Sequence, residues 1–547
     1  MNLMHLAQSG LSAAQASLNV IGNNINNLYT VGYSRQSIVL GEAGGKTTNY
    51  GFFGYGVQVN DVNRAYDAFV NDQLRSAQTK YSGLNSRYEQ LKQIDNMLGD
   101  KNNNVSSSLN NIFGALEKIS SDPVSMAARQ EAMSQFKSTA YQFQTSARTL
   151  TGLEKSTNTQ INQVVNDINA CTAELAAVNA ALYKTHAQTG GKPADLLDQR
   201  DLLLDKLSNL VGIKVDENPL TGEVNVALSN GLPLVRNDRT CLFETKPSAA
   251  NPSQLEVAYT DASGNAIKLD EEKISSGTLG GLFKFRNEDL PNARAQLNEL
   301  ALKMAHRFNE ANKAGFDIDG AAGGDIFTIA DPIALVNRNN QGDASLDIRF
   351  DDISEVKVQD YTLVYKGPGA NDWLITDSSG KQVTPTIGAQ GELTFDGITI
   401  QPQGTPEVDD SFVFNPAGGV AENISVAINH GDKIAASSSD NADEESNNEN
   451  IKDLIAIKNE ALIGKATLTE AYASLVSSVG SSVNSLKGNR DVAASVQKQA
   501  FEQRQGVSGV NEEKEYIYMQ MYTKYYQANA QVLQTANTIF DVILNIR

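Results

Sequence analysis

Charge is missing from both ends of this chain, although it is common in the middle. No Asp, Glu, Lys or Arg precedes Arg35, and after Lys524 the only charged residues are Asp541 and Arg547. A helix that faces water usually carries charged residues on its outer side. We therefore expect the two terminal segments to be surrounded by protein, with little water on any side.

Cysteine and histidine are scarce as well. The two cysteines, Cys171 and Cys241, are too few for a disulfide framework and lack metal-ligand spacing, although a disulfide between them stays open. No two histidines have the spacing His-x-x-x-His of a metal site. The histidines are His5, His186, His306 and His430. We expect no metal centre and no cofactor.

Basic clusters and long apolar runs are also absent. The net charge is −19, whereas nucleic-acid binding needs clustered Lys and Arg, so we expect no nucleic-acid partner. No window is long and apolar enough to span a bilayer, so we expect no membrane insertion. The first residues lack the basic start and apolar run of a cleaved secretory signal.

Acidic motifs in the middle of the chain are typical of helix starts and turns. The run 195–201 lies at an expected helix start, where carboxylates interact favourably with the helix dipole. Within it we expect Asp198 to pair loosely with Arg200 or Lys206. Residues 317–320 resemble the start of a calcium loop but lack its later acidic ligands, which favours a turn. No nucleophile motif is present, so we expect no catalytic residues and no enzyme.

Both ends of the chain show the sevenfold repeat of long helices. Residues 512–547 contain no Pro and no Gly. Burying about eight large residues at about 2 kcal/mol each would release on the order of 15 kcal/mol, but only against a partner. We predict an assembly interface, with ends that become ordered on assembly; an intramolecular helical hairpin is the alternative. The predicted interface residues are Leu11, Ala14, Leu18, Ile21, Ile25, Tyr518, Tyr525, Ala528, Val532, Ile539, Val542 and Ile546.

The middle of the chain alternates between helical and β patterns. Helices are predicted over 63–99, 110–119, 126–210 with a break at 189–193, 290–316 and 451–505. A period of two predicts β-structure near 213–276 and over 327–415, and the glycine-rich residues 41–56 predict a loop or hairpin. The fold class is therefore α+β: an elongated multidomain rod with paired terminal helices at one end, a helical bundle and inserted antiparallel β domains.

Three units follow from this order. Residues 1–35 with 507–547 would form the terminal helical unit. Residues 36–325 with 441–506 would form the bundle with the β insert near 213–276, and residues 326–440 the outer β-rich unit.

Several motifs resemble the family of bacterial flagellar rod, hook and hook-associated proteins. Residues 9–15, 23–27 and 30–35 (SGLSAAQ, NNINN and TVGYSR) are similar to the N-terminal motif of that family. Residues 528–537 and 544–547 are similar to its members at the hook–filament junction, as are the runs 81–90 and 195–201.

The resemblance implies a structural subunit that self-assembles into a ring between hook and filament. It implies contacts with the hook protein and with a second junction protein, and an extracellular location reached by flagellar type III export without a cleaved signal peptide. It also implies a cytoplasmic export chaperone, for which Tyr518, Tyr522 and Tyr525 are the expected contacts. The alternatives are another axial subunit of rod or hook type, or a secreted adhesin or hydrolase whose β domains carry the activity.

Overall fold

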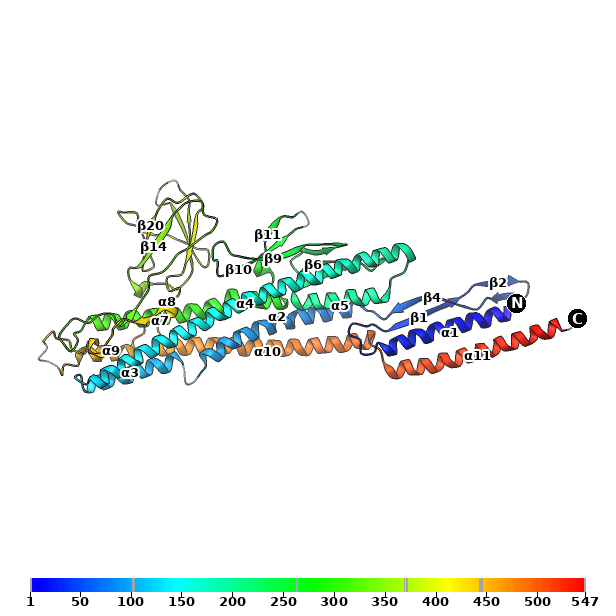
Figure 1. The fold of residues 1–547 in the computed structure, drawn as a ribbon, viewed down its shortest axis with the longest axis horizontal. Coiled ribbons are helices and arrows are strands. Elements are labelled where there is room, and N and C mark those ends of the chain that lie inside the picture. Colours follow the sequence, from blue (N-terminus) through cyan, green and yellow to red (C-terminus); the bar gives the residue numbers. More distant parts are fainter. Residues whose placement is uncertain are drawn as a thin grey trace.

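The molecule is an elongated rod of long helices with β-structure along one side (Figure 1). Both chain ends lie together at one end of the rod. The predicted α+β class and the paired terminal helices are thus confirmed. The computed structural model describes residues 2–100, 104–261, 264–367, 369, 372–441 and 446–545.

Long helices form the body of the rod. The longest, α4, has 64 residues and is about 96 Å long at the usual rise per residue. Ser125 caps its start by accepting a hydrogen bond from Ala128 N, and Gly190 ends it with a φ of 71°. The helices are α1 (Asn2–Asn26), α2 (Ala68–Leu98), α3 (Val105–Ser121), α4 (Met126–Thr189), α5 (Ala194–Leu210), α6 (Gly277–Lys284), α7 (Leu290–Lys313), α8 (Val420–Asn423), α9 (Glu449–Ala456), α10 (Leu468–Ser508) and α11 (Glu512–Leu544).

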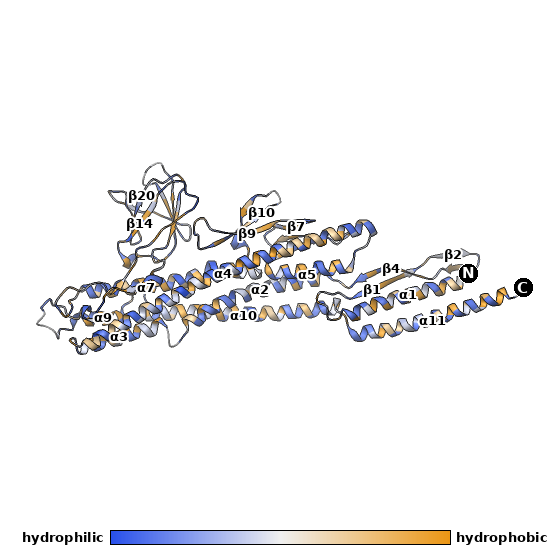
Figure 2. Cartoon of the chain, viewed as in Figure 1, coloured by the Kyte–Doolittle hydropathy of each residue, from blue (hydrophilic) through white to orange (hydrophobic). Residues whose placement is uncertain are grey.

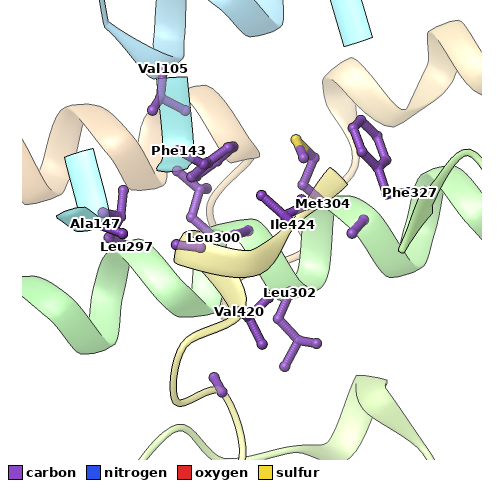
Figure 3. Packing of buried hydrophobic residues seen from close by; sticks show 14 of the residues in the cluster. Val105, Phe143, Ala147, Leu297, Leu300, Leu302, Met304, Phe327, Val420 and Ile424 are labelled. Carbon is purple, nitrogen blue, oxygen red and sulfur yellow. The ribbon is translucent and has the colours of Figure 1, made fainter. Parts of the chain in front are cut away.

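The core of the bundle is aromatic and aliphatic. Phe136 of α4 lies edge-on to Phe308 of α7 and to Phe327, with ring centroids 5.7 and 5.5 Å apart. Figure 3 shows Leu300 and Met304 of α7 in the same cluster. Along the helices apolar and polar residues alternate in patches, as expected where one face is buried (Figure 2).

Two β regions are inserted between the helices. The first is antiparallel and has the strand orders β5-β6-β7-β8 and β11-β10-β9. The second contains a five-stranded and a four-stranded sheet, ordered β13-β21-β15-β16-β17 and β14-β20-β19-β18. The first region comprises β5 (Ile213–Glu217), β6 (Val224–Leu228), β7 (Pro233–Arg236), β8 (Arg239–Thr240), β9 (Leu242–Pro247), β10 (Leu255–Thr260) and β11 (Ala266–Lys268). The second comprises β13 (Leu335–Val336), β14 (Ser345–Phe350), β15 (Tyr361–Tyr365), β16 (Trp373–Asp377), β17 (Gln382–Val383), β18 (Thr386–Ile387), β19 (Leu393–Phe395), β20 (Ile398–Gln403) and β21 (Ser411–Phe414), with β12 (Phe327–Thr328) and β22 (Ser425–Val426) paired at its base.

A β-arm lies beside α1, where the sequence predicted a loop or hairpin. Its outer strands pair as an antiparallel ribbon and its tip is a short hairpin. The strands are β1 (Gln36–Glu42), β2 (Gly45–Thr48), β3 (Gly51–Gly54) and β4 (Val57–Arg64). The arm follows the terminal helices toward the end of the rod (Figure 1).

Two predicted helices have different limits in the structure. The helix expected from residue 63 begins at Ala68, because the preceding residues belong to β4 and Asp67 caps the helix by accepting a hydrogen bond from Val70 N. The helix expected over 451–505 is broken between α9 and α10, and α10 starts with a capping box formed by Thr467 and Glu470. Cys171 and Cys241 are free thiols.

Gly281→Ala should destabilise the bundle by about 2 kcal/mol, because it overpacks a helix contact. Gly281 of α6 lies so close to α2 that a Cβ atom there would overlap the Gly83 carbonyl oxygen and Ser86 Oγ. We expect a thermal midpoint lower by about 5 °C, measured by circular dichroism.

Gly114→Ala and Gly152→Ala are the matched controls for that experiment. Both glycines are in helices, and a Cβ atom at either would meet no atom within 4 Å. Because alanine favours helix, these variants should be as stable as the original chain or slightly more stable. Equal midpoints for Gly281→Ala and the controls would contradict the close contact between α2 and α6.

Candidate assembly interface

α1 and α11 pack against each other as an antiparallel pair (Figure 1). Small residues of α1 allow a close approach: Ala7, Ala13 and Ala14 are buried, and a Cβ atom on Gly10 would overlap the Asn529 side chain. The intramolecular helical hairpin that the sequence left open is therefore present within one chain. That the two ends become ordered only on assembly stays a prediction.

The predicted interface residues lie on two different kinds of surface. On α1, Ala14 and Ile21 are buried within the chain, and Leu11, Leu18 and Ile25 are half-buried. On α11 the predicted row faces away from α1. Its exposed fractions are 40% for Tyr518, 39% for Tyr525, 40% for Val532, 49% for Ile539 and 56% for Val542, and Ala528 is also exposed. Ile546 lies outside the described residues.

A different row of α11 faces inward. The less exposed residues of this helix are Glu515, Met519, Tyr522, Asn529, Ala530, Leu533 and Ala536. Several of them are small or polar, which suits the close approach of Asn529 to Gly10. The row by which α11 contacts its own chain thus combines apolar residues with the polar Glu515 and Asn529.

The outer face of α11 is a large exposed apolar surface. Besides the predicted residues it includes Ile517 and Met521. Tyr516, Tyr526 and Phe540 are also exposed, but they lie on other sides of the helix. Figure 2 shows apolar residues reaching the very end of this helix. Contiguous apolar patches of this kind mark sites of protein–protein contact. The outer face of α11 therefore has the character of an unoccupied interface.

The β-arm adds exposed aromatic residues beside the terminal helices. Tyr50, Phe52, Phe53 and Tyr55 are all exposed, Tyr50 to 94%. The glycine-rich pattern of this segment indicated a turn and gave no sign of a contact surface. The only sequence signal for these exposed rings was the alternation of aromatic residues with glycine. Glycine has no side chain, so it cannot shield a neighbouring aromatic ring from solvent.

Polar side chains fix the inner end of the terminal helix pair. Asn24 of α1 is buried, and both the nitrogen and the oxygen of its side-chain amide form hydrogen bonds. Its Nδ2 donates to the Gln36 carbonyl oxygen at 2.8 Å and to Glu515 Oε2 at 3.1 Å. Its Oδ1 accepts from Tyr33 Oη at 2.8 Å and from Gln36 N at 2.9 Å. One asparagine therefore joins α1, the start of the β-arm and α11.

Glu515 is the second member of this polar group. It is 2% exposed and lies 3.5 Å from the Arg35 guanidinium. Burial raises the pKa of Tyr33 to about 12, and the nearby carboxylates of Asp198 and Glu515 add to the effect. The phenol of Tyr33 therefore stays protonated and remains a hydrogen-bond donor to Asn24.

Three aspartates on one face of α5 connect the helices around them. Asp198 binds Arg64 of the β-arm at 2.8 Å and accepts from Ser34 N at 3.1 Å. Asp201 binds Arg64 at 2.5 Å and Arg75 of α2 at 3.1 Å. The third aspartate, Asp205, pairs with Arg75 and with Arg504 of α10. This junction cluster joins the terminal unit to three elements of the bundle.

The prediction that Asp198 pairs with Arg200 or Lys206 is wrong. Arg200 is buried and forms ion pairs with Asp201 at 3.0 Å and with Glu217 at 3.2 Å. Asp198 faces the β-arm, so its partner is Arg64, which is remote in the sequence. The expectation that the acidic run is structural agrees with these contacts.

Within the junction cluster, the pKa values of two aspartates shift in opposite directions. Burial acts to raise the pKa of the Asp201 carboxyl, but Arg200, Arg64 and Arg75 outweigh it and the pKa lies below its ordinary value. Burial raises the pKa of Asp198, against the effect of its hydrogen bond from Ser34. The surrounding arginines thus hold the carboxylate of Asp201 in its charged form.

Across the part of the chain that the structure describes, no three His, Cys, Asp or Glu side chains come together as metal ligands. Asp317 accepts hydrogen bonds from Asp319 N and Ala321 N and pairs with Lys433, as expected of a turn. None of the described helices is long and apolar enough to cross a bilayer.

Family models match most of the chain. Residues 91–327 match the model described as flagellar hook-associated protein FlgK helical domain. Residues 335–416 match flagellar hook-associated protein 1, D2-like domain, and residues 4–33 match flagella basal body rod protein. The last match covers the first part of the terminal helix pair.

Full-length relatives agree with these models. Flagellar hook-associated protein 1 of Salmonella typhimurium is 38% identical over 555 residues, and that of Escherichia coli is 38% identical over 550 residues, each covering 100% of both chains. The structure of the flagellar hook junction protein FlgK from Burkholderia pseudomallei has the same fold, with a TM-score of 0.72, 24% identity, and coverage of 80% of this chain and 100% of that one. The chain therefore belongs to the flagellar hook-associated protein 1 (FlgK) family.

Proposed function

We propose that this protein is a structural subunit of the junction between the flagellar hook and filament, and that it self-assembles through its terminal helices. The observation that carries the proposal is the outward apolar row of α11, which its own chain leaves exposed. The absence of charge around this row supports close packing against further helices. Family membership supports the place of the subunit in the flagellum.

Partners follow from the same proposal. A ring of copies would contact the hook protein on one side and the second junction protein on the other. Tyr518 and Tyr525, which are exposed, and Tyr522, which is half-buried, would bind a cytoplasmic export chaperone before assembly. The protein would reach the outside of the cell through the flagellar export channel without a cleaved signal peptide.

The division into three units is part of the proposal as well. Residues 1–35 with 507–547 would enter the packed assembly, and residues 36–325 with 441–506 would surround it. Residues 326–440 would face outward. Where the terminal unit meets the bundle, Ser34 N donates a hydrogen bond to Asp198 of the junction cluster.

The test is capping of isolated hooks by purified protein. We expect the full-length chain to bind hook ends, and a chain that lacks the residues before Arg35 and after Gly506 to lose binding, because the apolar row is then missing. Sedimentation with hooks and electron microscopy measure the bound fraction. Binding by both chains would place the contacts in the middle of the molecule and contradict the proposal.

A chain that lacks residues 335–416 is the matched control. The first and last strands of this segment are paired at Leu335 and Val413, so a short linker can close the gap. Ile326 and Phe327 belong to the bundle core and must be kept. We expect this variant to cap hooks; loss of capping would favour a secreted protein whose outer β domain carries the function.

A further inference from the structure

A groove of about 710 Å³ lies on the side of the rod, between α2 and the first β region. One wall is the first half of α2, including Ser76 and Lys80, and the other is β5, including Ile213, Lys214 and Val215. The groove lies away from both ends of the rod (Figure 1). The proposed terminal interface does not use it.

The β wall of the groove is the free edge of a sheet. β5 is the first strand of its four-stranded sheet and pairs with β6 on one side. Residues 213–215 of this strand line the groove. Unpaired strand edges bind extended peptides, which add a strand through backbone hydrogen bonds.

The groove carries positive charge in an acidic protein. Lys80, Lys214 and Lys284 line it and form no ion pair within the described part of the chain. The neighbouring arginines are different, since Arg75 and Arg87 are neutralised by aspartates of the bundle. The whole chain has a net charge of −19, so these lysines form a local site for carboxylates.

The floor of the groove is closely packed. Gly83 of α2 and Gly281 of α6 meet backbone to backbone, so the two helices cannot move closer together. A preformed groove lowers the cost of ordering on binding. The structure thus combines a strand edge, a closely packed floor and unpaired lysines in one place.

We propose that this groove is a lateral docking site for a second copy of the chain, which contributes an extended, carboxylate-bearing segment that pairs with β5. The choice of a second copy rests on the proposed function. In the proposed ring every copy has a neighbouring copy beside it, so the side of one rod can face the next. The acidic surface of the same chain supplies the complementary charge.

Photo-crosslinking on capped hooks tests this site. The crosslinking residue p-benzoylphenylalanine replaces Ser76, which is exposed in the groove, or, as a control, Lys137, which is exposed on α4. After irradiation, the Ser76 variant should give a product of twice the chain mass that contains peptides of this chain alone, and the control should not. Mass spectrometry should locate the new bond on a segment rich in Asp and Glu.

A charge-reversed variant makes the test specific. In a chain that also carries Lys80→Glu, Lys214→Glu and Lys284→Glu, the yield of this product should fall by about tenfold. Capping without the product, a product with the hook protein, or a yield unchanged by charge reversal would overturn the inference and leave the proposed function standing. Failure of the unmodified chain to cap hooks would overturn both.

Discussion

Val532→Asp is expected to abolish capping of hooks while leaving the purified chain folded. Val532 is 40% exposed on the outer face of α11, so the new carboxylate stays hydrated in the free chain. In the proposed assembly the same position is covered by other helices. Burying an unpaired carboxylate there would cost at least about 3 kcal/mol for each copy, which is more than a hundredfold in affinity.

Two variants control for the change at Val532. Val532→Thr keeps the shape without the charge and should cap hooks with a modest loss. Val408→Asp places the same substitution at a valine that is 59% exposed in the outer β region, and it should cap normally. Unchanged capping by Val532→Asp would refute the buried row, and loss of the helical fold in solution would show that α11 belongs to the core of the free chain.

Asp201→Asn should lower the stability of the bundle by about 3 to 5 kcal/mol, because it removes one partner from a buried ionic network. Arg64, Arg75 and Arg200 all contact Asp201, and the amide that replaces it carries no compensating charge. In thermal unfolding followed by circular dichroism we expect a midpoint lower by about 10 °C.

Glu131→Gln is the matched control for this substitution. Glu131 pairs with Lys118 at 2.6 Å, but both side chains are exposed. Removal of a surface pair should change stability by less than about 1 kcal/mol. Similar midpoints for the two variants would show that the junction cluster contributes no more than an ordinary surface pair.

The pH dependence follows from the lowered pKa of Asp201. A carboxyl with a lower pKa in the folded state than in the unfolded state stabilises the fold above its unfolded pKa. This contribution should decrease as the pH falls below the ordinary aspartate range toward the folded pKa. The stability difference between the original chain and Asp201→Asn should therefore be full at neutral pH and shrink in acid.

The helices of this protein could be predicted from sequence because their apolar repeats are local. The sevenfold rows of both terminal segments indicated long helices, and the structure confirms them over α1 and α11. The face that α11 turns to its own chain could not be predicted. That face carries Glu515 and Asn529 among apolar residues, and the fit of Asn529 depends on the glycine at position 10 of another helix.

The junction cluster was beyond sequence reasoning for a related reason. Arg64 and Asp198 are 134 positions apart, and Arg504 and Asp205 are 299 apart. Nearby Arg200 and Lys206 offered plausible local partners for Asp198, and only the three-dimensional arrangement excludes them. The break before α10 was different, because the capping-box pattern of Thr467 and Glu470 was present in the sequence and marked the helix start.

The pairing of α1 with α11 also acts as a check on completeness. These helices come from distant parts of the sequence, and the outer face of α11 is presented on the pair that both build together. A chain that stops before α11 lacks one half of this pair. Incomplete subunits would thus be unable to join the assembly. No separate quality-control step would be needed to exclude them.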